Sequence, residues 1–129
     1  MGEGKIEKQQ KKLIELGVME SGDKLIDFLQ ASYVERLMGN VSFGKWKQGW
    51  AYFTEERLIV LTGILNENII IPYNNIRELG KCSQTLIPIG MKITYEDMKT
   101  GKIVTDKISM MKRNHWLDFI AEKAGVTIS

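Results

Sequence analysis

The stretch that decides the fold runs from residue 49 to residue 73 and reads GWAYFTEERLIVLTGILNENIIIPY. Two runs of aromatic and β-branched residues flank the polar residues 54–57, and a third run follows a second polar break. Runs of this kind, bounded by turn residues, are typical of an antiparallel strand meander. The pattern predicts strands over residues 49–53, 58–61 and 69–71. In the turn after the first of these strands, the Thr54 hydroxyl can form hydrogen bonds with backbone amides two or three residues further on.

Four more strands are expected outside this stretch. Alternation predicts strands over residues 76–82, 89–96 and 102–109, with a hairpin turn at residues 99–101 before the last of them. Asp106 interrupts the apolar pattern of that last strand, which indicates a bulge or a sheet edge. Residues 24–37 are ambiguous because their apolar residues also fit a helical stripe. A long, bent strand is the preferred interpretation, since Tyr33 and Val34 favour a sheet.

A helix is expected at each end of the chain. Residues 5–16 carry few apolar side chains, so that helix is expected to pack on the rim of the sheet or on a partner, and Gly17 is a suitable stop. Residues 111–124 form an amphipathic pattern ended by Gly125, with Ser109 and Asn114 as alternative N-caps. The apolar face of this second helix recurs at helical spacing through Trp116, Phe119, Ile120 and Ala124.

Composition limits the class of protein. A chain of 129 residues with 43% apolar and 26% charged side chains is most simply one globular core. The net charge of +2 is too small to indicate nucleic-acid binding. Cys82 is the only cysteine, which excludes an internal disulfide and a cysteine-based metal site. With no secretory signal and no apolar run near 20 residues, a cytoplasmic protein is expected, with any contact to the inner membrane face peripheral.

Two blocks in this chain resemble sequences of bacterial pleckstrin-homology-like (PH-like) and GRAM-like domains. They are GWAYFTEERLIV at residues 49–60 and IPYNNI at residues 71–76, and the similarity extends over residues 23–124. The resemblance implies a mainly β (α+β) fold: a bent seven-stranded antiparallel sheet, or partly open barrel, capped by the C-terminal helix. Trp116 matches the tryptophan of that helix in PH domains. Residues 1–22 would then be an additional N-terminal helix and linker, and residues 23–129 the PH-like domain.

No catalytic, cofactor or metal site is predicted. His115 is the only histidine, and neither it nor Cys82 has a partner that sequence spacing would supply for general-base, nucleophilic or zinc chemistry. The glycines are spread through turns and form no phosphate-binding loop. We therefore expect a non-enzymatic binding module. The predicted structural residues are Trp116, Trp50, Phe119 and Ile120.

The sequence leaves two kinds of binding partner possible. In PH and GRAM domains the loop between the first two strands reads anionic headgroups, and here that segment carries Lys45, Trp46 and Lys47, with Arg57 as a further candidate cation. The competing interpretation is that Trp46 covers the core. The other possibility, ranked level with lipid binding or slightly above it, is association with a protein or a second copy, since strand edges and the corner beside the helix accept peptide. Residues 64–65, apolar within a predicted loop, would suit such a contact.

Overall fold

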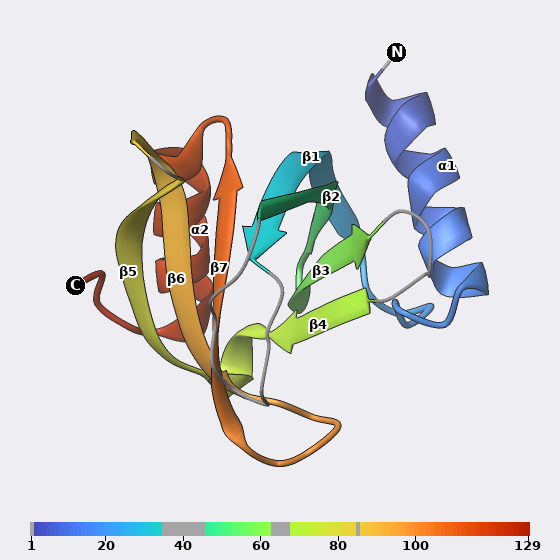
Figure 1. The fold of residues 1–129 in the computed structure, drawn as a ribbon. Helices are drawn as coiled ribbons and strands as arrows, with labels where there is room; N and C mark the ends of the chain where they lie inside the picture. Colours follow the sequence, from blue (N-terminus) through green and yellow to red (C-terminus); the bar gives the residue numbers. More distant parts are fainter. Residues whose placement is uncertain (1, 35–45, 63–67, 85) are drawn as a thin grey trace.

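The computed structural model describes residues 2–34, 46–62, 68–84 and 86–129 of the chain. Seven strands form one antiparallel sheet in the order β4-β3-β2-β1-β7-β6-β5, which is bent and not closed (Figure 1). The elements follow along the chain as α1 (Gly2–Glu15), β1 (Leu25–Val34), β2 (Trp46–Thr54), β3 (Arg57–Thr62), β4 (Asn68–Pro72), the short 3₁₀ helix η1 (Tyr73–Asn75), β5 (Ile76–Gln84), β6 (Ile87–Glu96), β7 (Ile103–Met110) and α2 (Arg113–Ala124).

The seven predicted strands and both predicted helices are present. Residues 25–34 are a strand and not a helix, which settles the ambiguity of that segment; the predicted end near residue 37 lies outside the described residues, as do residues 64–65. The turn between β2 and β3 forms as expected. Thr54 Oγ1 accepts hydrogen bonds from the backbone N–H groups of Glu56 and Arg57 and donates one to the Arg57 carbonyl. Three bonds from one buried hydroxyl therefore close this hairpin.

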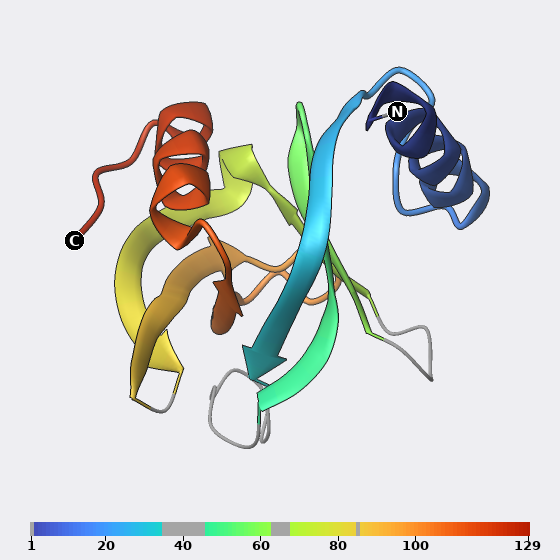
Figure 2. The ribbon, with the colours of Figure 1, turned by 90° about the horizontal axis from the view of Figure 1, so that it is seen from above.

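The concave face of the sheet and α2 enclose an apolar cluster, the inner core, which includes Phe53, Leu58, Ile93 and Trp116. β1 and β7 are joined by three residue pairs at the bend, and Figure 2 shows β5–β7 and α2 on one side of β1. Trp116, Leu117 and Ile120 are buried on α2 and pack against the concave face of the sheet. Gly125, at φ +69°, ends the helix, and its N–H and that of Val126 both donate to the Ala121 carbonyl.

The convex face of the β1–β4 half carries a second apolar group, the outer cluster. It consists of Leu13, Val18, Met19, Leu25, Tyr52 and Ile59, all buried. Both faces of β3 are thus covered, as its unbroken apolar run predicts: Leu58 and Val60 point to the inner core and Ile59 to the outer cluster.

Helix α1 lies on this outer cluster, at the opposite side of the molecule from α2 (Figures 1 and 2). The prediction that it packs on the rim or on a partner is wrong, because its own sheet takes its apolar face. Its C-terminus forms a Schellman motif: Val18 N–H donates to the Leu13 carbonyl, Gly17 N–H to the Ile14 carbonyl, and Gly17 adopts φ +77°. The Gln10 side chain also accepts a hydrogen bond of 2.9 Å from the Leu25 N–H at the start of β1.

Two local expectations are wrong. Asp106 is neither at a bulge nor at an edge: it pairs in register with Ile93, is 1% exposed, and its Oδ2 accepts a hydrogen bond of 2.5 Å from the Tyr95 hydroxyl. A polar partner on the neighbouring strand therefore accommodates the carboxylate. Helix α2 begins at Arg113 and uses neither predicted cap; its N-cap residue is Lys112, at φ +58°, with no side-chain capping bond.

Candidate functional site

The predicted basic site is not assembled as one cluster. Trp46 and Lys47 are the first residues of β2 and do not belong to the preceding loop; Lys45 lies outside the described residues. Arg57 lies at the other end of the β2–β3 hairpin, where its Nη1 donates to the Val18 carbonyl at 3.4 Å and its Nη2 to Glu20 at 3.5 Å. Arg57 therefore attaches the segment after α1 to the sheet. Lys47 lies at the start of β2, and Arg57 lies beyond the far end of that strand, so the two side chains do not form one site.

The predicted structural residues occupy different environments. Trp116 and Ile120 are buried, and Phe119 packs against the inner core. Trp50 is 42% exposed on the convex face, where its ring lies 6.1 Å from that of Phe28. Trp46 is half-buried, and Lys47 is exposed at the start of the strand.

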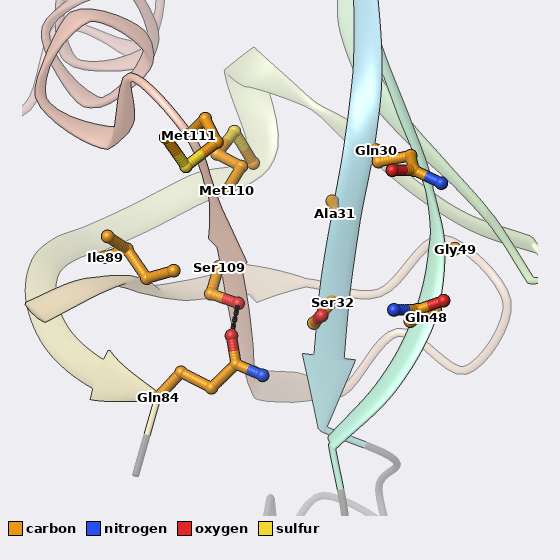
Figure 3. A pocket seen from close by; sticks show the side chains of 10 residues that line it. All are labelled: Gln30, Ala31, Ser32, Gln48, Gly49, Gln84, Ile89, Ser109, Met110 and Met111. Atoms are coloured by element: carbon orange, nitrogen blue, oxygen red, sulfur yellow. Dashed lines mark hydrogen bonds between the residues drawn. The ribbon is translucent and has the colours of Figure 1, made fainter. Parts of the chain in front are cut away.

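A small pocket of about 170 Å³ opens where β1 meets β7 (Figure 3). Amide and hydroxyl groups supply its polar lining, and the Ser109 hydroxyl donates a hydrogen bond to the Gln84 side chain. Figure 3 shows Ile89, Met110 and Met111 on the β6–β7 side. The described lining contains no charged side chain, so this pocket offers hydrogen bonds to uncharged groups and no attraction for an ionic one. Its polar residues are Gln30, Ser32, Gln48, Gln84 and Ser109.

A different surface already holds a peptide segment. The edge of β5 is paired in parallel with the chain's own residues 126–129, through a bridge between Leu79 and Ile128. The Ser129 N–H donates to the Leu79 carbonyl at 2.9 Å, and the Ser129 hydroxyl donates to the same oxygen at 3.2 Å. The contact is one isolated parallel bridge, and it has the backbone pairing geometry with which a strand is added to a sheet edge.

The side chains of this segment alternate as those of a half-buried strand do. Val126 and Ile128 are half-buried and pack against the inner core, whereas Thr127 and Ser129 are exposed. The sequence analysis did not predict this pairing. The alternation Val-Thr-Ile-Ser after Gly125 was the signal that could have found it, although four residues make a weak pattern.

Recesses flank the segment on both sides. One, of about 430 Å³, lies toward α2 and is lined by Leu117, Asp118 and Ile128 among others. The other, of about 370 Å³, lies over the convex face of β5 and β6, and its lining includes Lys92 and Ser129. Gly80 lines the second recess: a Cβ added there would meet Ser129 Oγ at 3.2 Å, so the absence of a side chain lets the segment approach closely.

Positive charge gathers on the convex face next to this recess. Lys92 and Lys107 stand directly opposite each other on β6 and β7. Arg113 lies close by, since its Nη1 donates to the Gly90 carbonyl at 2.7 Å. Burial raises the pKa of the Cys82 thiol, and the charges of Lys107, Lys92 and Arg113 oppose that rise. Cys82 is therefore a poor nucleophile at neutral pH.

The described part of the chain shows no cluster of side chains that could bind a metal. No group of three or more histidine, cysteine or acidic side chains could hold a metal ion among the residues placed by the structure. His115 is exposed, and its ring meets that of Trp116 edge-on at 4.6 Å. Neither helix, within the described ranges, is long and apolar enough to cross a membrane.

Solved structures with this architecture identify the fold, although no protein-family model and no curated protein sequence matches the chain. The C-terminal domain of an unknown protein from Leishmania infantum matches with a TM-score of 0.61 at 16% identity, covering 90% of this chain and 94% of that one.

Two further structures carry the fold's name. The Slm1 PH domain in complex with inositol-4-phosphate matches with a TM-score of 0.57 at 6% identity, covering 78% of this chain and 95% of that one. The DH/PH fragment of PDZRHOGEF in complex with human RhoA matches with a TM-score of 0.59 at 13% identity, over 88% of this chain and 32% of that one. The chain thus spans about a third of that fragment. Its bent, open seven-stranded sheet, capped by a C-terminal helix, is a pleckstrin-homology-like fold.

Proposed function

We propose that this chain is a non-enzymatic binding module of the PH-like kind that associates with proteins by accepting an extended peptide at the edge of β5, beside α2. The observation that carries the proposal is the backbone hydrogen bond from the Ser129 N–H to the Leu79 carbonyl. A sheet edge that receives a strand from its own chain has the geometry to receive one from another chain.

The segment at residues 126–129 indicates what such a peptide looks like. Apolar side chains at the positions of Val126 and Ile128 would turn toward the inner core, while those at the positions of Thr127 and Ser129 would face outward. Backbone bonds would give affinity and the inward apolar residues would give register. A structure with a similar fold, the DH/PH fragment of PDZRHOGEF, was solved in complex with a protein, RhoA.

The tethered segment competes with any peptide in solution. A short tether confers an effective concentration on the order of millimolar, so an added peptide should bind more tightly when the chain's own segment is weakened. In the 129-residue chain, Ile128→Asp places a charge against the inner core and should release the segment without altering the sheet.

The test titrates an acetylated, amidated hexapeptide with the sequence of residues 124–129, AGVTIS, into the 129-residue chain carrying Ile128→Asp. Backbone amide NMR should show saturable shifts centred on Leu79, Gly80 and Leu117, and weaker shifts with the unaltered chain. A peptide carrying Ser129→Pro lacks the donating N–H and should not bind, whereas Ser129→Ala keeps that N–H and should bind. Equal binding of the Pro and Ala peptides, or no binding of AGVTIS, contradicts the proposal.

An alternative function is peripheral binding of anionic lipid headgroups at the start of β2. In its favour, Lys47 is exposed beside the half-buried Trp46, and the Slm1 PH domain was solved with inositol-4-phosphate. Each cation near an anionic surface contributes only about 1 kcal/mol. The chain should then sediment with anionic but not neutral vesicles, and Lys45→Glu with Lys47→Glu should abolish sedimentation. Absence of sedimentation at low salt rejects this alternative.

A further inference from the structure

We propose that the pocket between β1 and β7 binds one ring of a neutral sugar, and that the side chains of Ser32, Gln48, Gln84 and Ser109 hold it. The described lining of this pocket does not include Leu79 or residues 126–129, so a ligand there goes beyond the proposed function.

Two hydroxyl groups lie next to each other in the pocket. Ser32 on β1 is paired directly with Ser109 on β7, and directly paired residues of an antiparallel sheet project from the same face. Ala31, the neighbour of Ser32, belongs to the inner core, so the two serines point to the convex face. Gln48 is the partner of Ser32 on β2, and Gln84 at the end of β5 accepts the hydrogen bond of Ser109. Short side chains between two longer ones therefore form a depression in the sheet (Figure 3).

The polar groups of the pocket match sugar hydroxyl groups in kind. Each primary amide and each hydroxyl both donates and accepts hydrogen bonds, and a sugar hydroxyl also does both. A phosphate or carboxylate would instead favour cationic partners, and an ammonium group would favour carboxylates; the described lining has neither. Gln48 is exposed and Ser32 and Gln84 are half-buried, so a solute can reach their amide and hydroxyl groups. This chemistry favours a ligand that is rich in hydrogen-bonding groups and carries no charge.

The pocket has the size of one sugar ring. Its volume of about 170 Å³ corresponds to about six water molecules at roughly 30 Å³ each. The strands that carry Gln48 and Ser109 are two inter-strand spacings apart, or about 9.5 Å. A pyranose ring with its hydroxyl groups fills such a space, whereas a longer saccharide would have to extend beyond it.

Apolar surface beside the polar groups would contact the C–H faces of the ring. Ile89 and Met111 line the β6–β7 side of the pocket, and Met111 is 72% exposed. Trp50 is directly opposite Gln30, which also lines the pocket, and is two residues from Gln48 on the same face of β2. Aromatic rings and thioethers present flat or adaptable apolar surface next to polar groups. The exposed side chains of Met111 and Trp50 therefore supply the apolar contact that a sugar ring needs besides hydrogen bonds.

The experiment titrates the methyl glycosides of glucose, galactose and mannose into the 129-residue chain and follows its backbone amide NMR signals. At least one glycoside should give saturable shifts centred on Ser32, Gln48 and Ser109, with a Kd of roughly 1–10 mM for a ligand of this size. N-acetylglycine N-methylamide, a neutral peptide unit, should bind at least about five-fold more weakly than the best glycoside, because it has no ring of hydroxyl groups. If no glycoside shifts these signals by about 100 mM, or the peptide unit binds within about five-fold of the best glycoside, the sugar site is rejected.

Protein variants assign the binding to the two amides. Gln48→Met and Gln84→Met each keep the length of the side chain and remove its hydrogen-bonding groups, so each should weaken binding by about three- to ten-fold. Gln9→Met makes the same change on α1, outside the described lining, and should leave binding unchanged. Gln48 is exposed, so its variant should keep the native spectrum and gives an answer even if the loss of Gln84 disturbs the fold.

Unchanged affinity in the Gln48→Met chain, or an equal loss in the Gln9→Met chain, contradicts the proposal. Either result leaves the proposed function intact, since the AGVTIS titration measures binding at a different surface.

Discussion

The indole ring of Trp116 lies parallel to the phenyl ring of Phe53, with centroids 4.1 Å apart and planes inclined by 7°. Phe119 meets both rings edge-on, at 5.4 Å from Trp116 and 6.0 Å from Phe53. Trp116 and Phe119 come from α2 and Phe53 from β2. These three rings therefore join the C-terminal helix to the half of the sheet formed by β1–β4.

Trp116→Ala should lower the free energy of unfolding by about 3–5 kcal/mol, because it removes a large aromatic side chain that is 4% exposed. Chemical denaturation followed by circular dichroism measures this. Trp50→Ala is the matched control: that side chain is 42% exposed, and its loss should cost about 1 kcal/mol or less. Similar losses for both variants would show that α2 does not hold the sheet closed.

Tyr73 should make the fold sensitive to alkaline pH. Burial, and secondarily the negative charge of Asp23, raise the pKa of its hydroxyl above the ordinary value of 10.0. The folded chain thus keeps a proton that the unfolded chain loses, so this contribution to stability is complete below pH 10 and is lost as the pH rises beyond it. The slope is at most about 1.4 kcal/mol per pH unit for one group.

The measurement is the free energy of unfolding between pH 8 and pH 12. Tyr73→Phe lowers stability at every pH, since the hydroxyl donates a bond of 2.8 Å to the Thr54 carbonyl, but it should flatten the alkaline decline. Tyr52, whose pKa burial also raises, accounts for part of the remaining slope. An unchanged slope in the Tyr73→Phe chain would contradict the assignment.

Gly17→Ala should destabilise the chain by roughly 1 kcal/mol, since φ +77° is unfavourable for a residue with a Cβ. No atom lies within 4 Å of the added Cβ, so the cost is conformational and not steric. Gly22→Ala is the comparison: that glycine also has open space but no positive φ, and the change should be neutral or slightly stabilising. Thermal unfolding of the two variants distinguishes these effects; equal melting temperatures would argue against the Schellman motif.

Local signals made most of the fold predictable. The Thr54 turn, the glycine stops at Gly17 and Gly125, and the helical spacing that includes Trp116 each depend on residues a few positions apart, and all appear in the structure. The environment of Asp106 depends on Tyr95, eleven positions away on another strand, and a single-strand pattern does not contain that information.

The candidate site was less predictable for the same reason. The position of Trp46 depends on how far the pairing of β2 with β1 extends along the two strands. The composition of the preceding loop does not specify that length. The attachment of residues 126–129 depends on Leu79 and on the missing side chain at Gly80, about fifty residues earlier. Arg57 was a candidate cation for a ligand because nothing in the sequence indicated that the turn after α1 would take its hydrogen bonds.

Leu13 and Leu16 test whether α1 is an integral part of the fold. Leu13 lies in the last turn of α1 and Leu16 directly follows the helix, and the two differ in burial: Leu13 is 0% exposed within the outer cluster, and Leu16 is 49% exposed. Leu13→Ala should cost about 2–5 kcal/mol, because it leaves a cavity between α1 and the convex face of the sheet. Leu16→Ala should stay within roughly 0.5 kcal/mol of the unaltered chain. Denaturant titration of the two variants gives both values. Near-neutral effects for both would mean that α1 contributes little to the stability of the sheet, whereas the expected difference makes the outer cluster a second core that the sheet needs.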